Sequence, residues 1–267
     1  MNAPLAPVDF SDRLQRLQET VSASKLGTFF QCRLKYFFRY VLKLPKAKTP
    51  ALHVGGTIHS TLKAWNKARW KNQPLTTTQL HQEFAKMWAE QEDEPVTWEA
   101  GEEKEQQATA WRLLETYIRE SPINAAEKPD AVEVPVETDL SAHGLPRLVG
   151  IIDLVQAGKI VDYKTSSTTP NPVTVAHLNE AQTSCYAILY RNATGRTELG
   201  MELHYLVKLK APKIVVTPLP PMSEEQETRL FRVIESYQHG LESRDFVPSP
   251  GMGCLSCEFF NECRQWS

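Results

Sequence analysis

The sequence predicts an α/β fold with a mixed central sheet flanked by helices, an N-terminal helical subdomain and a cysteine-ligated C-terminal tail. Three observations lead to this prediction. Apolar residues recur at three- and four-residue steps over most of residues 24–120, alternate at period two over residues 131–165, and then form two more helical segments and two more strands. With 267 residues and 41% hydrophobic content, the chain can bury a core without disulfide bonds.

Four helices are predicted before the first strand. The first is capped by Ser24 and carries apolar side chains at helical spacing until Pro45 and Pro50 end it. The second follows a pair of glycines, the third follows three threonines that can cap it, and the fourth ends at a proline. They cover residues 24–42, about 57–70, a segment that starts at 76–78, and 102–120.

Strands and helices then alternate. Segments of alternating apolar and polar residues predict three strands, and a proline-marked loop precedes a long helix. Two further strands and a last helix capped by Ser223 follow. The predicted strands are residues 131–140, 148–156, 159–165, 199–208 and 213–218, and the predicted helices are 175–192 and 223–241.

The second and third strands read as a tight hairpin that brings two carboxylates together. If residues 157–158 form a two-residue turn, Asp153 lies opposite Asp162, and Lys164 shares that face. Two opposed carboxylates among Ile and Val residues need a cation, and Mg²⁺ or Mn²⁺ suits such oxygen ligands. The alternative is an ordinary hairpin whose charges lie on a solvated outer face, but the apolar neighbours of both acids argue against it.

The motif Gly-Ile-Ile-Asp153, followed nine residues later by Asp162-Tyr-Lys164, resembles the core of the PD-(D/E)XK nucleases. The resemblance implies that Asp153 and Asp162 hold a divalent ion, to which the backbone carbonyl of Tyr163 adds a ligand. It also implies that Lys164 orients the attacking water and offsets negative charge in the transition state.

A histidine motif lies upstream of the hairpin. The segment Gly-Gly-Thr-Ile-His59 resembles the G-x-x-x-H motif of RecB-like members, whose histidine reaches the metal from a helix. A lone histidine on a helix is more often a packing or surface residue. His53, six residues earlier, is the candidate to exclude.

A glutamine and a tyrosine follow the hairpin. The segment Gln182-Thr-Ser-Cys-Tyr186 matches the Q-x-x-x-Y motif of these nucleases, and the four-residue spacing puts both side chains on one helical face. They can bind a phosphate or hold Lys164 in place, although an amphipathic helix edge would give the same spacing. Glu133 is a further candidate acid near the site.

The cysteines predict a metal-bound tail. Cys254, Cys257 and Cys263 lie within ten residues, and Cys32 is a distant fourth, whereas Cys185 lies among packing residues. This arrangement resembles the 4Fe-4S staple of AddB and of CRISPR-associated spacer-acquisition nucleases. Thiolates also bind zinc, and spacing alone leaves both metals open.

Charge is unevenly distributed along the chain. Residues 21–82 contain eleven Lys and Arg and no acid, whereas residues 83–150 contain sixteen acids and six bases. A basic face suits a DNA backbone, and Lys25, Arg33, Lys35 and Arg39 are the candidate contacts. The alternative is that the two segments neutralise each other.

These observations predict three regions: a basic helical region of residues 1–125, a nuclease core of residues 126–245 and an iron-sulfur tail of residues 246–267. The expected protein is a cytoplasmic Mg²⁺- or Mn²⁺-dependent DNA exonuclease that acts on single strands or free ends, with a helicase, CRISPR or recombination partner. No export signal or membrane-spanning run is evident. The rival hypotheses are a non-catalytic DNA-binding scaffold and a zinc-stapled regulator.

Overall fold

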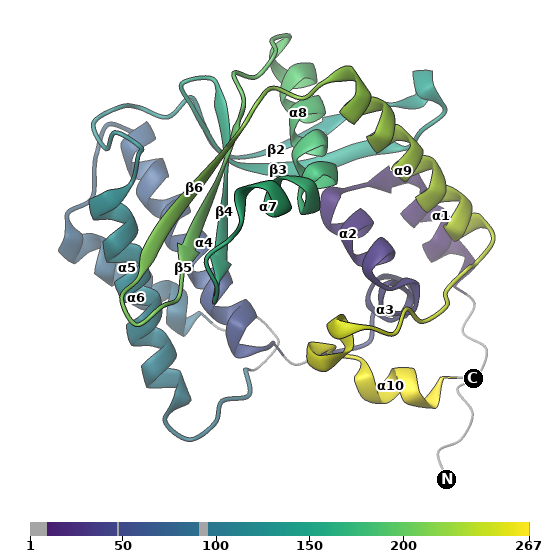
Figure 1. Ribbon diagram of the computed structural model, residues 1–267, viewed down its shortest axis with the longest axis horizontal. Coiled ribbons are helices and arrows are strands. Elements are labelled where there is room, and N and C mark those ends of the chain that lie inside the picture. Colours follow the sequence, from purple (N-terminus) through teal and green to yellow (C-terminus); the bar gives the residue numbers. More distant parts are fainter. Residues whose placement is uncertain (1–9, 47, 91–95, 267) are drawn as a thin grey trace.

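The computed structural model describes residues 10–46, 48–90 and 96–266 and contains a six-stranded mixed sheet (Figure 1). The strand order is β1-β3-β4-β5-β6, and β2 pairs with β3 outside this path. β1 is parallel to β3 and β4 to β5, whereas the other pairs are antiparallel. The strands are β1 Thr20–Val21, β2 Ala131–Thr138, β3 Arg147–Gln156, β4 Lys159–Ser166, β5 Met201–Val207 and β6 Lys213–Leu219. The predicted mixed sheet is therefore confirmed.

Helices cover both faces of this sheet, and none of those described is long and apolar enough to cross a membrane. α4, α5 and α6 pack over Leu154 and Val161, while α1, α2, α8 and α9 pack over Ile152 and Ile160 on the other face. The helices are α1 Ser11–Glu19, α2 Ala23–Gln31, α3 Arg33–Tyr36 with a π-helical turn Phe37–Leu42, α4 Pro50–Trp70, α5 Thr77–Ala89, α6 Glu102–Glu120, α7 Pro172–Leu178, α8 Glu180–Thr194, α9 Glu224–Glu242 and α10 Phe260–Gln265.

The first predicted helix is broken at Cys32. Helix α2 begins two residues earlier than expected. Its N-cap is Ser22 and not Ser24, and the Ser22 side chain accepts the hydrogen bond from Lys25 N. Cys32 adopts an extended backbone, and its thiol accepts a hydrogen bond from Lys35 N, so it caps α3. The break turns Cys32 toward the C-terminal tail, which a continuous helix would not do.

Two other boundaries differ from the sequence prediction. Pro50 is the first residue of α4 and does not merely terminate the previous helix, because proline fits the first turn, where no amide donor is needed. Thr49 caps this helix. The predicted helix over residues 175–192 is divided into α7 and α8 at Asn179.

Gly240 in α9 allows a close approach of this helix to Phe29 of α2. A Cβ atom there would lie 2.4 Å from Cζ of Phe29, which is fully buried. We therefore expect Gly240→Ala to lower the free energy of unfolding by roughly 1–3 kcal/mol through overpacking. Gly27→Ala in α2 meets no atom within 4 Å and should be neutral or slightly stabilising. Urea denaturation of both variants would test this, and equal stability would contradict it.

Candidate active site

The β3–β4 hairpin has the predicted register. Gln156 pairs with Lys159 across a turn whose two residues, Ala157 and Gly158, have φ angles of 49° and 72°. These positive angles are those of the tight turn that matches strand twist. The ladder runs as far as the pair Leu154↔Val161, so the next two residues, Asp153 and Asp162, lie where the strands separate.

Asp153 occupies the opening between these strands. Its Oδ2 accepts a hydrogen bond from the backbone N of Tyr163 on β4 at 3.3 Å. The residues on either side of it pack in opposite cores: Ile152 under α8 and α9, Leu154 under α4 and α6. Since residues two apart normally share a face, the regular alternation of β3 is interrupted at Asp153. The carboxylate is therefore accessible to side chains from both helical layers.

Asp162 is the buried carboxylate of the pair, with 3% of its surface exposed. Burial raises its pKa above the usual value, Asp153 adds to the effect, and Lys164 opposes it. Lys164 Nζ lies 2.8 Å from Asp162 Oδ2, but this oxygen accepts no hydrogen bond with good geometry from any described residue. Asp162 Oδ2 is thus available to coordinate a metal cation.

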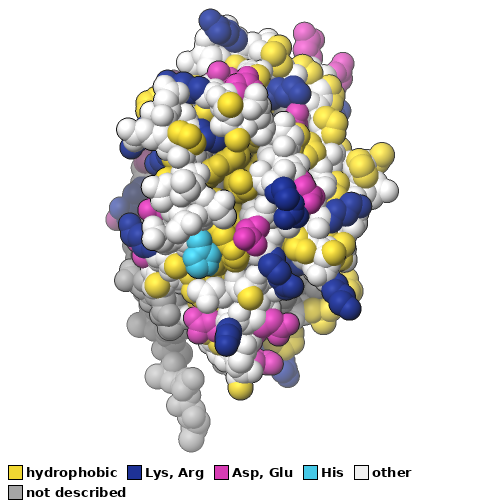
Figure 2. Space-filling view, turned by 90° about the vertical axis from the view of Figure 1, so that its left-hand side faces the viewer, with side chains coloured by type: hydrophobic (Ala, Val, Ile, Leu, Met, Phe, Trp, Pro, Cys, Tyr) yellow, Lys and Arg dark blue, Asp and Glu magenta, His cyan; other side chains and the backbone are white. Residues whose placement is uncertain are grey.

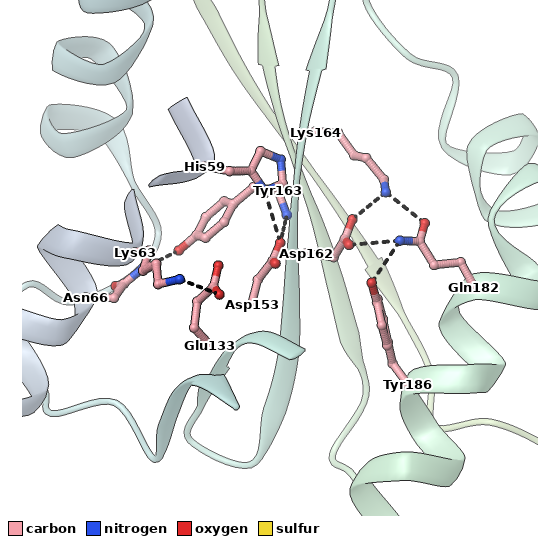
Figure 3. A network of polar contacts seen from close by, with 10 residues as sticks. All are labelled: His59, Lys63, Asn66, Glu133, Asp153, Asp162, Tyr163, Lys164, Gln182 and Tyr186. Carbon is pink, nitrogen blue, oxygen red and sulfur yellow. Dashed lines mark hydrogen bonds and ion pairs between the residues drawn. The ribbon is translucent and has the colours of Figure 1, made fainter. Parts of the chain in front are cut away.

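Gln182 joins Lys164, Asp162 and Tyr186 in one network (Figure 3). Its Oε1 accepts a hydrogen bond from Lys164 Nζ at 2.7 Å, and its Nε2 lies 3.2 Å from Asp162 Oδ1 and 3.1 Å from Tyr186 Oη. Gln182 and Tyr186 are one turn apart on α8, as their spacing predicted. The amide therefore fixes the direction of the Lys164 ammonium.

His59 reaches the site from α4. Its Nδ1 lies 3.4 Å from Asp153 Oδ2. Burial works to lower the pKa of the imidazole, but the hydrogen bond and charge of Asp153 and the charge of Asp162 raise it above the usual value. His53, by contrast, is buried against Trp88 and Trp98, so it is a packing residue and not part of the site.

Glu133 and Lys63 complete the surroundings of Asp153 (Figure 3). The register of β2 on β3 places Glu133 opposite Asp153, and Lys63 Nζ lies 2.9 Å from Glu133 Oε2. Glu133 has a φ of 51°, which is uncommon for a residue other than glycine inside a strand. Sequence reasoning missed Lys63, although its position four residues after His59 was a usable signal.

The donors present suit a hard divalent ion. Two carboxylates and a backbone carbonyl are oxygen ligands of the kind Mg²⁺ and Mn²⁺ prefer, and Asp162 Oδ2 is buried without a hydrogen bond. Within the described part of the chain, no group of three or more His, Cys, Asp or Glu residues is yet placed to hold an ion. Binding would thus require Asp153 and Asp162 to exchange contacts with His59 and Lys164 for contacts with the metal.

Comparison with protein families agrees with this geometry. A model of the PD-(D/E)XK nuclease superfamily matches residues 20–264. The chain belongs to this superfamily. It is therefore a nuclease by family, and the superfamily's substrate class is DNA.

A solved structure supports the fold of this nuclease. It is similar to a candidate exonuclease from Eubacterium rectale with a TM-score of 0.60 and 15% identity, covering 100% of this chain and 94% of the other. It also resembles the structure of SSO0001 with a TM-score of 0.43 and 11% identity, covering 96% and 94%. A search of curated proteins finds no match.

Four of the nuclease's cysteines line one cavity of about 190 Å³. They are Cys32, Cys254, Cys257 and Cys263, whereas Cys185 is buried in α8. Burial and the charges of the other three cysteines raise the pKa of Cys263, as expected where thiols lie close together. Phe259 of the tail packs against α3 beside this cavity. The tail and the first basic helices thus meet where the sequence placed the fourth cysteine.

A groove of about 940 Å³ adjoins the candidate active site, since Asp153, Gln182 and Tyr186 are among the residues that line it. Its lining includes Glu133, Glu137, Val149 and the half-exposed Ile151, and it includes no Lys or Arg. The groove is therefore apolar and acidic in character.

Most of the four predicted DNA contacts of the nuclease have internal partners. Lys25 Nζ donates to the main-chain and side-chain oxygens of Thr20, Arg33 pairs with Asp245, and Lys35 Nζ lies 2.9 Å from Glu258. Arg39 lies over the ring of Tyr40.

On the face that carries α5 and α6, Lys and Arg are interspersed with Asp and Glu around a hydrophobic hollow (Figure 2). That face thus forms no uniform basic patch.

Proposed function

We propose that this nuclease is a Mg²⁺- or Mn²⁺-dependent deoxyribonuclease of the RecB-like kind that hydrolyses single-stranded DNA from an end. The observation that carries the proposal is the contact of Gln182 with both Lys164 and Asp162, beside Asp153 and His59. This arrangement holds a lysine and a buried carboxylate in one orientation. A hairpin with a purely structural role has no need for such an arrangement.

Each side chain has a distinct part in the proposed reaction. When bound by Asp153, Asp162, His59 and the Tyr163 carbonyl, the ion would polarise the phosphate and acidify the attacking water. Lys164, held by Gln182 at 2.7 Å, orients that water and offsets the negative charge that develops on the phosphoryl oxygens. Tyr186 holds the other end of the Gln182 amide.

We further propose that Cys32, Cys254, Cys257 and Cys263 bind a 4Fe-4S cluster. Four cysteines that line one cavity suit iron-sulfur or zinc binding, and the residues of the cavity include apolar side chains that would shield a cluster. The cluster would fix the tail, residues 246–267, against the basic region of residues 1–125 and beside the core of residues 126–245.

The expected partner proteins and cellular location follow from the same proposal. A chain with no recognisable helicase motif depends on another protein to produce single strands, so a helicase, recombination or CRISPR partner and a cytoplasmic location fit best. The RecB-like placement rests on His59, Gln182 and Tyr186 as motif residues.

The test compares linear and circular single-stranded DNA, with linear duplex DNA as a third substrate. Anaerobically purified protein with Mn²⁺ should shorten linear single strands labelled at one end, leave circles intact, and stop when EDTA removes the metal. Comparing DNA labelled at the 5′ end with DNA labelled at the 3′ end would give the polarity of cleavage. Failure of the intact, iron-loaded protein to cut any of these DNAs would instead favour a non-catalytic or partner-dependent DNA-binding scaffold.

A further inference from the structure

A row of basic side chains runs along α4 to its C-cap, Lys71. His59, Lys63, Lys67 and Lys71 follow one another at four-residue steps, so neighbours lie about one turn, roughly 6 Å, apart along the helix. This rise is comparable to the distance between consecutive phosphates of an extended strand. We call these four residues the α4 ridge.

The ridge begins at the catalytic centre. His59 contacts Asp153, and the next residue, Lys63, pairs with Glu133, which lies opposite Asp153 in the sheet (Figure 3). Lys63 keeps 39% of its side chain exposed despite this pair. A phosphate next to the scissile one would therefore meet Lys63 first.

The far end of the ridge is open. Lys67 and Lys71 are exposed, and neither forms an ion pair within the described residues. Lys128 lies over the ring of Trp70 beside this end and adds another positive charge. Unpaired lysines in line with a catalytic centre can exchange their counterions for phosphates, which is the main source of sequence-independent affinity.

The opposite side of α4 is fixed rigidly. Arg69 is 3% exposed and donates to the carbonyl oxygens of Asn124, Ala125 and Glu127 and to Gln156 Oε1. These hydrogen bonds tie the helix to the segment that precedes β2 and to the end of β3. The ridge therefore has a fixed position relative to the carboxylates, as a substrate track requires.

The other candidate paths are less suitable for phosphates. The groove that holds Asp153, Gln182 and Tyr186 must admit the scissile phosphate. Its other charged residues are Glu133 and Glu137 and it contains no Lys or Arg, so it is less favourable for the rest of a phosphate backbone. On α2 and α3, Lys25, Arg33 and Lys35 already have partners.

We propose that the phosphate backbone of single-stranded DNA extends from the catalytic centre along the α4 ridge, with Lys63, Lys67 and Lys71 as successive phosphate contacts. The inference rests on the proposed nuclease function and deepens it. It assigns the affinity for DNA to α4 and the chemistry to the strands β3 and β4.

The experiment measures binding of labelled single-stranded DNA by a Lys164→Ala protein, which should not consume it, at several salt concentrations. Adding Lys67→Glu and Lys71→Glu should weaken binding at least about tenfold and reduce the slope of log affinity against log salt by about 1.4, since each lost contact contributes about 0.7. Lys86→Glu with Lys104→Glu, exposed residues of α5 and α6, makes the same charge change as a matched control and should alter the slope little.

Two outcomes would overturn the inference. One is a ridge variant that binds no more weakly than the Lys86/Lys104 control. The other is an unchanged ridge variant beside a large loss in Arg39→Glu, which would place the backbone on the π-helical turn that follows α3. Both leave the proposed function standing if the unmodified protein cleaves DNA, whereas absence of cleavage and of binding by the unmodified protein would refute the function itself.

Discussion

Replacing Asp162 with asparagine should lower the rate of DNA hydrolysis at least a thousandfold, which corresponds to roughly 4 kcal/mol of transition-state stabilisation. The amide has nearly the shape of the carboxylate, so the contacts of the neighbouring side chains can persist. It lacks the negative charge that a divalent ion needs as a ligand and that holds Lys164 Nζ at 2.8 Å. The loss should therefore lie in the chemical step rather than in DNA binding.

The same substitution should not destabilise the fold. Asp162 is 3% exposed and burial raises its pKa, so keeping the side chain ionised in the folded state costs free energy. Asparagine removes this cost, and we expect an equal or higher free energy of unfolding. Single-turnover cleavage and urea denaturation would be measured together, with the exposed Glu115→Gln as a matched control. An Asp162→Asn protein that is active, or inactive only because it unfolds, would contradict the assignment.

The register of the β3–β4 hairpin, which carries the candidate catalytic residues, could be predicted because its geometry is local. A two-residue turn at Ala157 and Gly158 fixes the register, and the register brings Asp153 next to Asp162. Gln182 and Tyr186 meet for the same reason, since four residues make one helical turn. None of these contacts depends on distant parts of the chain.

The features that were missed depend on distant residues. The break in the first helix occurs at Cys32, whose thiol also accepts a hydrogen bond from Ser249 N in the tail. The two-residue strand β1 exists only because it pairs with β3. Local propensity contains no information about such partners, which explains why the sequence predicted one uninterrupted helix there.

The charge distribution along the chain did not show which of its bases are paired, for a similar reason. The run of bases without acids over residues 21–82 suggested free cations on α2 and α3. The acids that pair with Arg33 and Lys35 come more than 200 residues later, as Asp245 and Glu258. A basic segment therefore predicts a nucleic-acid surface only where the fold leaves its charges unpaired, as at Lys67 and Lys71.

Replacing Cys257 with serine should have the largest effect on the C-terminal part of the protein. We expect loss of bound iron and sulfide and of the brown colour, because a four-cysteine site would lose one ligand. By analogy with a disulfide across a loop of similar length, releasing the tail should lower stability by roughly 3–5 kcal/mol. Cys185→Ala is the matched control: it removes a thiol buried in α8 and should leave the iron content unchanged.

The order of the losses discriminates between the possible roles of the tail. Phe259 packs on α3, and Glu258 pairs with Lys35, whereas the catalytic carboxylates lie on β3 and β4. A released tail should therefore disturb α3 and weaken DNA binding before it alters cleavage of saturating DNA. Metal analysis, limited proteolysis of the tail and binding assays would be compared for Cys257→Ser and Cys185→Ala. Zinc in place of iron in the unmodified protein would refute the cluster, and unchanged stability and DNA affinity in Cys257→Ser would refute its structural role, because a staple that can be removed without consequence does not hold the two ends of the chain together.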